Sequence, residues 1–291
     1  MNDPSQLALA LIFLFTLVGA ACAILLRSQF GQSGLRATPP PIPQGKVSAW
    51  FYRPADLVGA LVLYLVFAGL FALSCLAAPM DAEDYTAGAL IFSMVFQLIL
   101  AAVVCRLALR LTNSNQWLGW RWKAWPWLFL IGPGVVIFML VIFWLIQLSG
   151  YLEWMESLGV ETIQDTVSLL QEGRDPVVLI LLVITATLIA PVCEEVVFRG
   201  YLHPILKKYG GVWVGALFSS LLFSVAHGNL AVALPLFLLG AILVWLYELT
   251  GSIWAPIAVH FCFNATTVFA QLATRNMEIP SAILPGLQVF P

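Results

Sequence analysis

Charged residues are scarce in this sequence: only 10% of its 291 residues are Asp, Glu, Lys or Arg, whereas 61% are hydrophobic. Soluble globular domains contain about 25% charged residues. The formal net charge of -2 also means that the chain lacks the basic excess of nucleic-acid-binding proteins. The composition therefore excludes an ordinary soluble domain, argues against a nucleic-acid partner and is typical of a protein embedded in the lipid bilayer.

Cysteine is also infrequent, and its placement excludes a disulfide scaffold. All five cysteines lie within apolar segments, at Cys22, Cys75, Cys105, Cys193 and Cys262. A cysteine in such a segment usually behaves as a small buried hydrophobe. We therefore expect neither disulfides nor a catalytic thiol.

Long apolar runs are the main feature of the chain. A helix that crosses a bilayer needs about 20 apolar residues. Eight segments approach this length, at 6–26, 55–78, 86–109, 125–148, 177–200, 211–227, 230–249 and 252–274. The first has no positive charge before it, unlike a signal peptide, so we expect a retained helix. We predict an all-α fold, a polytopic transmembrane helical bundle with about eight spans.

Lysine and arginine are concentrated in three alternate connections. Of the 13 basic residues, 11 fall within residues 27–53, 106–123 and 199–208. Loops rich in Lys and Arg stay on the cytoplasmic side of a cell membrane. With eight spans, the three basic connections are predicted to be cytoplasmic and both termini to lie outside.

Intramembrane polar groups divide the chain into parts. They are few before residue 176 and frequent after it, so we predict an N-terminal transmembrane region over 1–176, a catalytic helical core over 177–274 and a C-terminal tail over 275–291. The outer connection 149–176 is either an interfacial segment with Tyr151 and Trp154 as anchors or a solvated loop.

Other polar and aromatic residues are expected at the headgroups. Five tryptophans from Trp117 to Trp127 predict an aromatic belt. His203, Glu248 and Asp56 lie near predicted helix ends, from which their side chains can reach the membrane surface.

Ionisable residues within three of the last four apolar segments suggest a functional site, because a charge inside a membrane is costly unless it is paired or faces a cavity. The segment 177–200 carries Glu194, Glu195 and Arg199, and the later segments carry Phe223, His227, His260 and Asn264. Glu195 and Arg199 are four residues apart and can pair on one helix face. Glu194 is rotated by about 100° and can face another helix.

These groups suit peptide-bond hydrolysis. The reaction needs a base that takes a proton from water and an acid that protonates the leaving amine, and a carboxylate can serve both steps. Histidine can position the water, and an asparagine amide is a neutral donor for an oxyanion. Arg199 can hold Glu195 ionised and fixed.

Three short motifs give the site a family resemblance. The sequence EEVVFRG at 194–200 resembles the EExxxR motif of the CAAX protease and bacteriocin-processing family, intramembrane proteases that include type II CAAX prenyl endopeptidases. Phe223–His227 and His260–Asn264 match the FxxxH and HxxxN motifs of that family, in the same order. The resemblance covers about residues 180–273.

The resemblance implies a role for each residue. Glu194 would be the catalytic base, and Glu195 a supporting carboxylate oriented by Arg199. His227 would position or activate the water, with Phe223 in support. His260 and Asn264 would complete the site at the oxyanion. The substrate would be a peptide, or a lipid-anchored or membrane protein, and no oligomeric state is predicted.

Two catalytic classes remain open within this family. We favour direct glutamate catalysis without a cofactor, because the sequence lacks the HExxH motif that presents two zinc ligands and a base on one helix. The alternative is a zinc site formed by Glu194, His227 and His260, three ligands with an open fourth position.

Other functions are also considered. A non-catalytic immunity or scaffold protein of the same family would use the motifs only to stabilise the bundle. A proton-coupled transporter could use a Glu and His relay, but the sequence shows no inverted repeat. Gly31–Gly34 matches the GxSG string of rhomboid proteases only by coincidence, and no aspartate lies mid-helix as in presenilin-like proteases.

Overall fold

The computed structural model describes residues 4–30, 45–74, 85–120, 122–160, 162 and 164–275, and these ranges contain helices and no strand. The elements are α1 (Pro4–Phe30), α2 (Pro54–Ser74), α3 (Ala87–Leu109), α4 (Ser114–Leu118), η1 (Trp125–Trp127), α5 (Leu128–Leu148), α6 (Tyr151–Ser157), α7 (Asp165–Glu172), α8 (Pro176–Ile184), η2 (Thr185–Ile189), α9 (Ala190–Glu194), η3 (Glu195–Leu202), α10 (His203–Gly210), α11 (Val212–Val225), α12 (Ala233–Thr250) and α13 (Trp254–Thr274). The predicted tail after Arg275, the GxSG string and Cys75 lie outside the described residues.

Within these ranges, seven helical segments are long and apolar enough to cross a membrane, and α11 is a shorter apolar helix. They confirm a polytopic membrane bundle of roughly eight spans. Several predicted boundaries differ from the observed ones, and the first helix ends at Phe30 and not at residue 26. The fifth apolar helix runs without interruption from Pro176 to Gly210 instead of ending at residue 200, and the sixth ends at Val225. At 14 residues, α11 is only about 21 Å long.

Glycine fixes the end of the long fifth helix. The carbonyl of Lys207 accepts the N–H of Gly211, which has a φ of 95°. Other residues rarely adopt this conformation, so the chain can reverse here directly into α11. The C-terminal part of the fifth helix, η3 and α10, therefore lies beside α11.

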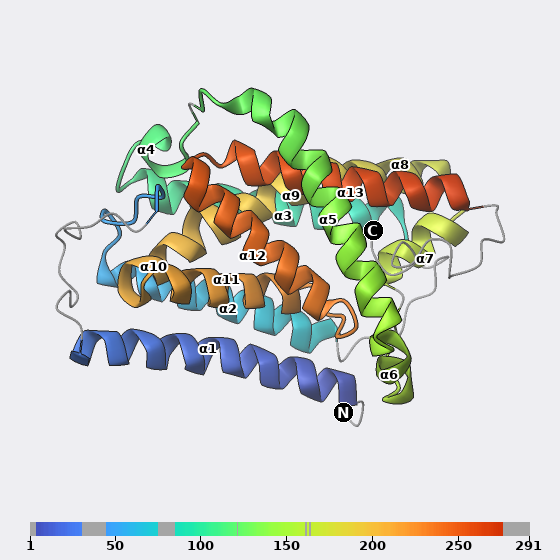
Figure 1. The fold of residues 1–291 in the computed structure, drawn as a ribbon, viewed down its shortest axis with the longest axis horizontal. Helices are drawn as coiled ribbons and strands as arrows, with labels where there is room; N and C mark the ends of the chain where they lie inside the picture. Colours follow the sequence, from blue (N-terminus) through green and yellow to red (C-terminus); the bar gives the residue numbers. More distant parts are fainter. Residues whose placement is uncertain are drawn as a thin grey trace.

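The long helices lie roughly along one direction, while α5 and α12 cross them obliquely (Figure 1). α11 packs between α1 and α12, and α13 packs against α5 and η2. In Figure 1, α1 begins and α13 ends at the same end of the bundle, where α7 also lies.

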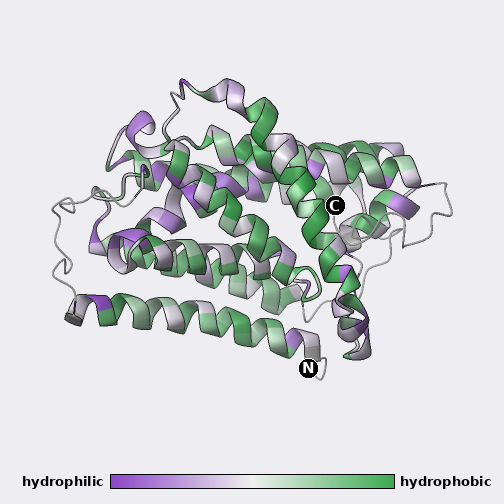
Figure 2. Cartoon of the chain, viewed as in Figure 1, coloured by the Kyte–Doolittle hydropathy of each residue, from purple (hydrophilic) through white to green (hydrophobic). Residues whose placement is uncertain are grey.

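Large apolar side chains are exposed along the helices. Phe92, Phe129 and Phe269 are each more than 70% exposed. Figure 2 shows apolar residues along most of the long helices and hydrophilic residues gathered around α4 and α10. A soluble monomer rarely exposes apolar patches of such extent, so this surface fits an integral membrane protein.

The three connections predicted to be cytoplasmic meet at one end of the bundle, where basic side chains of one connection contact residues of another. Arg27 Nη1 donates to the carbonyl of Gly210 at 3.3 Å, and Lys207 Nζ donates to the carbonyl of Val47 at 2.9 Å. Arg110 pairs with Asp56 at 3.2 Å. Asp56 is therefore buried in an ion pair at 2% exposure, which corrects its expected place at the headgroups.

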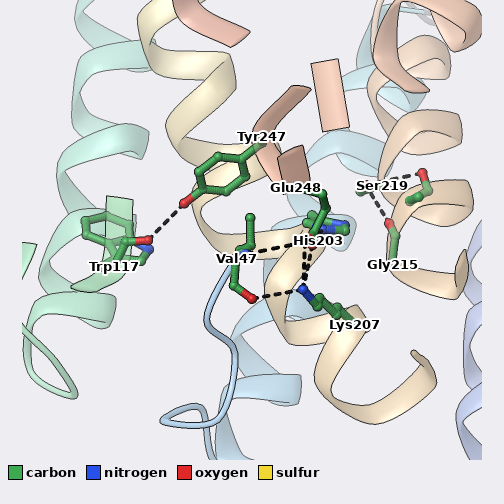
Figure 3. Close-up of polar contacts among 9 residues, drawn as sticks. Val47, Trp117, His203, Lys207, Gly215, Ser219, Tyr247 and Glu248 are labelled. Carbon is green, nitrogen blue, oxygen red and sulfur yellow. Dashed lines mark hydrogen bonds and ion pairs between the residues drawn. The ribbon is translucent and has the colours of Figure 1, made fainter. Parts of the chain in front are cut away.

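Two more residues expected at the headgroups form a buried charge cluster (Figure 3). Glu248 accepts from Lys207 Nζ at 2.7 Å and lies 2.7 Å from His203 Nε2, and the N–H of Val47 donates to its second oxygen. His203 is fully buried. The prediction for His203 and Glu248 was wrong because Glu248 of α12 reaches His203 and Lys207 of α10, a long-range contact that sequence spacing does not reveal.

Trp117 likewise belongs to the core and not to an aromatic belt. It is 2% exposed, and its Nε1 donates to the carbonyl of Gly200 at 2.6 Å. The hydroxyl of Tyr52 donates to the same carbonyl at 3.0 Å. Burial holds the pKa of Tyr52 well above its usual value, so the hydroxyl stays protonated as a donor. Trp125 and Trp127 are exposed, as a belt requires.

The connection 149–176 contains two short helices, α6 and α7. Tyr151 of α6 donates its hydroxyl to the carbonyl of Leu230 at 3.3 Å, and Trp154 is exposed. In α7, Val167 and Leu170 are fully buried. The second half of this connection is therefore packed onto the bundle and is not a solvated loop.

Candidate active site

The helix that carries the two glutamates departs from regular α geometry on both sides of them. The segments η2 and η3 are π-helical, and α9 between them ends at Glu194. Single π turns are frequent at functional sites, because an inserted residue changes which side chains face a neighbouring helix. Here they set the directions of Glu194 and Glu195 within one continuous helix.

Glu195 and Arg199 form the ion pair that their spacing predicts. Arg199 Nη1 lies 2.9 Å from Glu195 Oε1, and both side chains are fully buried. Arg199 Nη2 also donates to the carbonyl of Gly240 in α12 at 3.2 Å. A buried pair is favourable only when its charges are matched and hydrogen-bonded. These contacts give partners to Glu195 Oε1 and to both terminal nitrogens of Arg199, whereas Glu195 Oε2 and Arg199 Nε have no hydrogen-bond partner among the described residues.

His260 of α13 contacts the same carboxylate. Its Nδ1 lies 2.9 Å from Glu195 Oε1, and the ring is 2% exposed. An ionised carboxylate only accepts hydrogen bonds, so Nδ1 carries the proton and Nε2 is the acceptor of the neutral ring. Nε2 lies 3.8 Å from Glu194 Oε2, beyond direct hydrogen-bond range.

Phe223 is fully buried and connects these groups. Its ring lies beneath the Arg199 guanidinium at 4.3 Å and meets the rings of His227 and His260 edge to face, at 4.9 and 5.8 Å between centroids. A cation over an aromatic face and edge-to-face ring pairs are both attractive. Phe223 therefore helps to orient both histidines and the arginine.

His227 lies just beyond the end of α11. Its Nδ1 lies 2.8 Å from the carbonyl of Phe223, four residues earlier. A carbonyl can only accept, so Nδ1 carries the proton and Nε2 is again the acceptor of the neutral ring. The spacing of Phe223 and His227 thus fixes the ring through the backbone as well as through ring packing.

Asn264 is tied to the π-helical turn before Glu194. Within η2, the N–H of Ala190 donates to the carbonyl of Thr185, five residues earlier. The same pattern would pair the carbonyl of Ala186 with Pro191, which has no N–H. Asn264 Nδ2 donates to this carbonyl at 2.9 Å and so takes the place of the missing donor.

A cavity of about 250 Å³ brings the predicted residues together. Its lining includes Glu194, His227, His260 and Asn264. The side chain of Glu194 is 24% exposed, and its Oε2 has no hydrogen-bond partner among the described residues. Glu195, Arg199 and Phe223 do not line the cavity. Glu195 contacts His260, and Phe223 contacts both histidines, so these residues support the cavity lining from behind.

A second, smaller cavity of about 130 Å³ adjoins the first at Glu194 and His227. Its other walls are mostly apolar and come from α2, α3 and η3, including Phe67, Phe96 and Phe198. Glu194 therefore has space on two sides, one lined by both polar and apolar residues and one lined mostly by apolar residues.

The zinc alternative does not fit the arrangement of the donors. In the described ranges, no group of three His, Cys, Asp or Glu side chains is placed to hold a metal ion, and this includes Glu194, His227 and His260. Nδ1 of each histidine is engaged, with Glu195 or with the Phe223 carbonyl, so only Nε2 of each ring is without such a contact. We therefore derive no step through a metal.

The cavity is also lined by residues that were not predicted from the sequence. Tyr85, Leu90 and Ser93 come from α3 and the two residues before it, and Gln164, Thr166 and Leu169 come from α7 and the residue before it. Nothing in their spacing distinguishes them from the surrounding sequence. Only the packing of α3 and α7 against α8 and α13 brings them to the site.

Comparisons with known proteins point to the same part of the chain. Residues 176–266 match the family model described as type II CAAX prenyl endopeptidase Rce1-like. This match confirms the resemblance drawn from the three motifs. No solved structure matches the chain.

Two curated proteins are similar to the same third of the chain. One, from Bacillus subtilis (strain 168), is named "Putative membrane peptidase YdiL" and is 30% identical over 92 residues, which are 32% of this chain and 38% of that protein. The other, from Escherichia coli, is named "Uncharacterized 24.3 kDa protein" and is 36% identical over 94 residues, 31% of this chain and 42% of that protein. The chain thus spans about two fifths of the length of these relatives.

Proposed function

We propose that this Rce1-like chain is an integral-membrane endopeptidase that hydrolyses a peptide bond in a membrane-associated peptide or protein tail. The observation that carries the proposal is the cavity lined by Glu194, His227, His260 and Asn264. These four residues come from α9, α13 and the chain just after α11, so three separate parts of the fold supply them. The basic end of the bundle faces the cytoplasm in this proposal.

Glu194 is the general base. A water held between its carboxylate and the acceptor Nε2 of His260 loses a proton to Glu194 as its oxygen attacks the substrate carbonyl carbon. The 3.8 Å between Glu194 Oε2 and His260 Nε2 is too long for a direct hydrogen bond and leaves both atoms free for such a water. Nε2 of His227 offers a second acceptor in the same cavity.

Asn264 stabilises the oxyanion. One N–H of its amide is used by the carbonyl of Ala186, and an amide carries two. The second N–H donates to the oxygen of the tetrahedral intermediate. The C–N bond then breaks, and Glu194 returns its proton to the leaving amine, so that water is consumed and two peptides are released.

Glu195 and Arg199 do not touch the substrate in this mechanism. Their ion pair holds the proton on Nδ1 of His260, which keeps Nε2 as the acceptor. The direct experiment compares the wild type with Glu194→Gln in detergent, using a peptide library. We expect a fall in kcat of about 10²–10⁴-fold with an unchanged melting temperature.

Glu153→Gln is the matched control, because Glu153 is an exposed glutamate of α6 away from the cavity. It should change neither activity nor stability. If Glu194→Gln retained full activity, Glu194 would not be the base. If it lost stability, Glu194 would have a structural role, as expected for a non-catalytic scaffold protein.

A further inference from the structure

We infer that Gln164 is a substrate-positioning residue whose side-chain amide donates a hydrogen bond to a backbone carbonyl of the bound peptide. This inference rests on the proposed peptidase function and adds to it a contact from outside the Rce1-like segment. Gln164 lines the same cavity as Glu194 and is 8% exposed. Its Nε2 is buried and has no hydrogen-bond partner among the described residues.

An amide donor in this position is costly unless something binds it. A buried donor without a partner destabilises a protein by about 1–3 kcal/mol. Gln164 is the residue that precedes α7, where Ser, Thr, Asp and Asn are favoured because their short side chains cap the helix. The side chain of Gln164 makes no such cap, so its amide is left available to a ligand in the cavity.

The position of Gln164 is fixed by the rest of α7. Its carbonyl accepts the N–H groups of Val167 and Ser168 at 2.9 and 3.1 Å. Val167 and Leu170 are fully buried against the bundle. At the other end of α7, Gln171 Nε2 donates to Gln271 Oε1 in α13 at 2.6 Å. The backbone of Gln164 is therefore held in place before any ligand binds, and its side chain is confined at the edge of the cavity by burial.

The chemistry of the cavity selects a neutral acceptor. The carboxylate of Glu194 lines the same space and would repel an anion, whereas a peptide carbonyl is uncharged and accepts a hydrogen bond. Leu90, Leu169 and Leu182 form apolar walls around it. The ligand is thus a peptide segment with apolar side chains, held by a hydrogen bond to its backbone.

The experiment uses Gln164→Met, which keeps the length of the side chain and removes the amide. Gln171→Met is the matched control, because it makes the same change in α7 to an amide that has a protein partner. Melting temperature in detergent is measured for both, together with kcat and KM for a decapeptide selected from a randomised library presented in micelles. Binding of that library to the Glu194→Gln protein is measured with and without Gln164→Met.

We expect Gln164→Met to melt at the wild-type temperature or above, to raise KM about tenfold and to leave kcat within threefold. Gln171→Met should melt at a lower temperature with KM unchanged. A fall in the melting temperature of Gln164→Met equal to that of Gln171→Met, or an unchanged KM, would overturn the inference while the peptidase function stands. Absence of cleavage by the wild type, together with library binding that Gln164→Met weakens, would reject the peptidase function and retain the peptide contact. Absence of any library binding would overturn both.

Discussion

Nδ1 of His260 lies 2.9 Å from Glu195 Oε1, the same oxygen that Arg199 holds at 2.9 Å. This relationship decides which ring nitrogen of His260 carries the proton. The carboxylate accepts from Nδ1, so in the neutral ring the acceptor is Nε2, which lies 3.8 Å from Glu194 Oε2. The Glu195–Arg199 ion pair, which helix spacing alone explains as structural, thus also determines which tautomer of His260 faces the cavity.

His260→Gln should lower kcat by about 10²–10⁴-fold, because glutamine keeps a donor toward Glu195 but cannot present an aromatic acceptor nitrogen to a water beside Glu194. KM should change little, since His260 binds the water in this mechanism and not the substrate. Steady-state kinetics on one peptide would separate the two parameters. A rise in KM with kcat unchanged would show that His260 binds substrate instead.

Arg199→Leu should destabilise the protein by about 3–5 kcal/mol, because it leaves Glu195 as an unpaired charge in a site with no solvent exposure. Unfolding in detergent at several denaturant concentrations measures this loss. The double variant Glu195→Leu with Arg199→Leu removes both charges and should recover much of the stability.

The double variant should nevertheless remain inactive, because Nδ1 of His260 then has no acceptor to fix its proton. Recovery of stability without recovery of activity would separate the structural from the chemical role of the pair. Full activity in the double variant would contradict the proposed control of His260.

Glu248→Gln should destabilise the basic end of the bundle by about 3–5 kcal/mol, because Lys207 and His203 lose the carboxylate that both contact (Figure 3). The activity of the folded fraction should be unchanged, since none of these three residues lines the cavity of Glu194. Melting temperature and kcat, measured well below the melting transition, test the two statements separately. A lower kcat for the fully folded variant would contradict this prediction and would show that the charge cluster influences the site.

Sequence reasoning succeeded where a relationship depends on local spacing or on composition. The Glu195–Arg199 pair follows from four-residue spacing on a helix, and the apolar runs predict the membrane bundle. It failed where the relationship depends on packing between distant segments. Glu248 meets His203 across 45 residues, and Trp117 meets Gly200 across 83.

The missed details of the site have the same origin. The π-helical turns on either side of Glu194 arise within apolar sequence that reads equally well as a regular helix. Gln164 lies in a connection of ordinary composition, and only the burial of Val167 and Leu170 brings it to the cavity. Pro191 was the one available signal for the tether of Asn264, since a proline inside a helix leaves a carbonyl without its donor.

Asn264→Leu should affect stability and activity by separate amounts, because the amide has one N–H on the carbonyl of Ala186 and one free for the oxyanion. Loss of the first contact leaves a carbonyl unpaired and should lower the free energy of unfolding by about 1–3 kcal/mol. Loss of the second should lower kcat by about 10²–10³-fold. Both quantities are measured on the same preparation, with kinetics at a temperature where wild type and variant are fully folded. If stability fell and kcat did not, Asn264 would only tether η2, and the oxyanion donor would have to be sought elsewhere in the cavity.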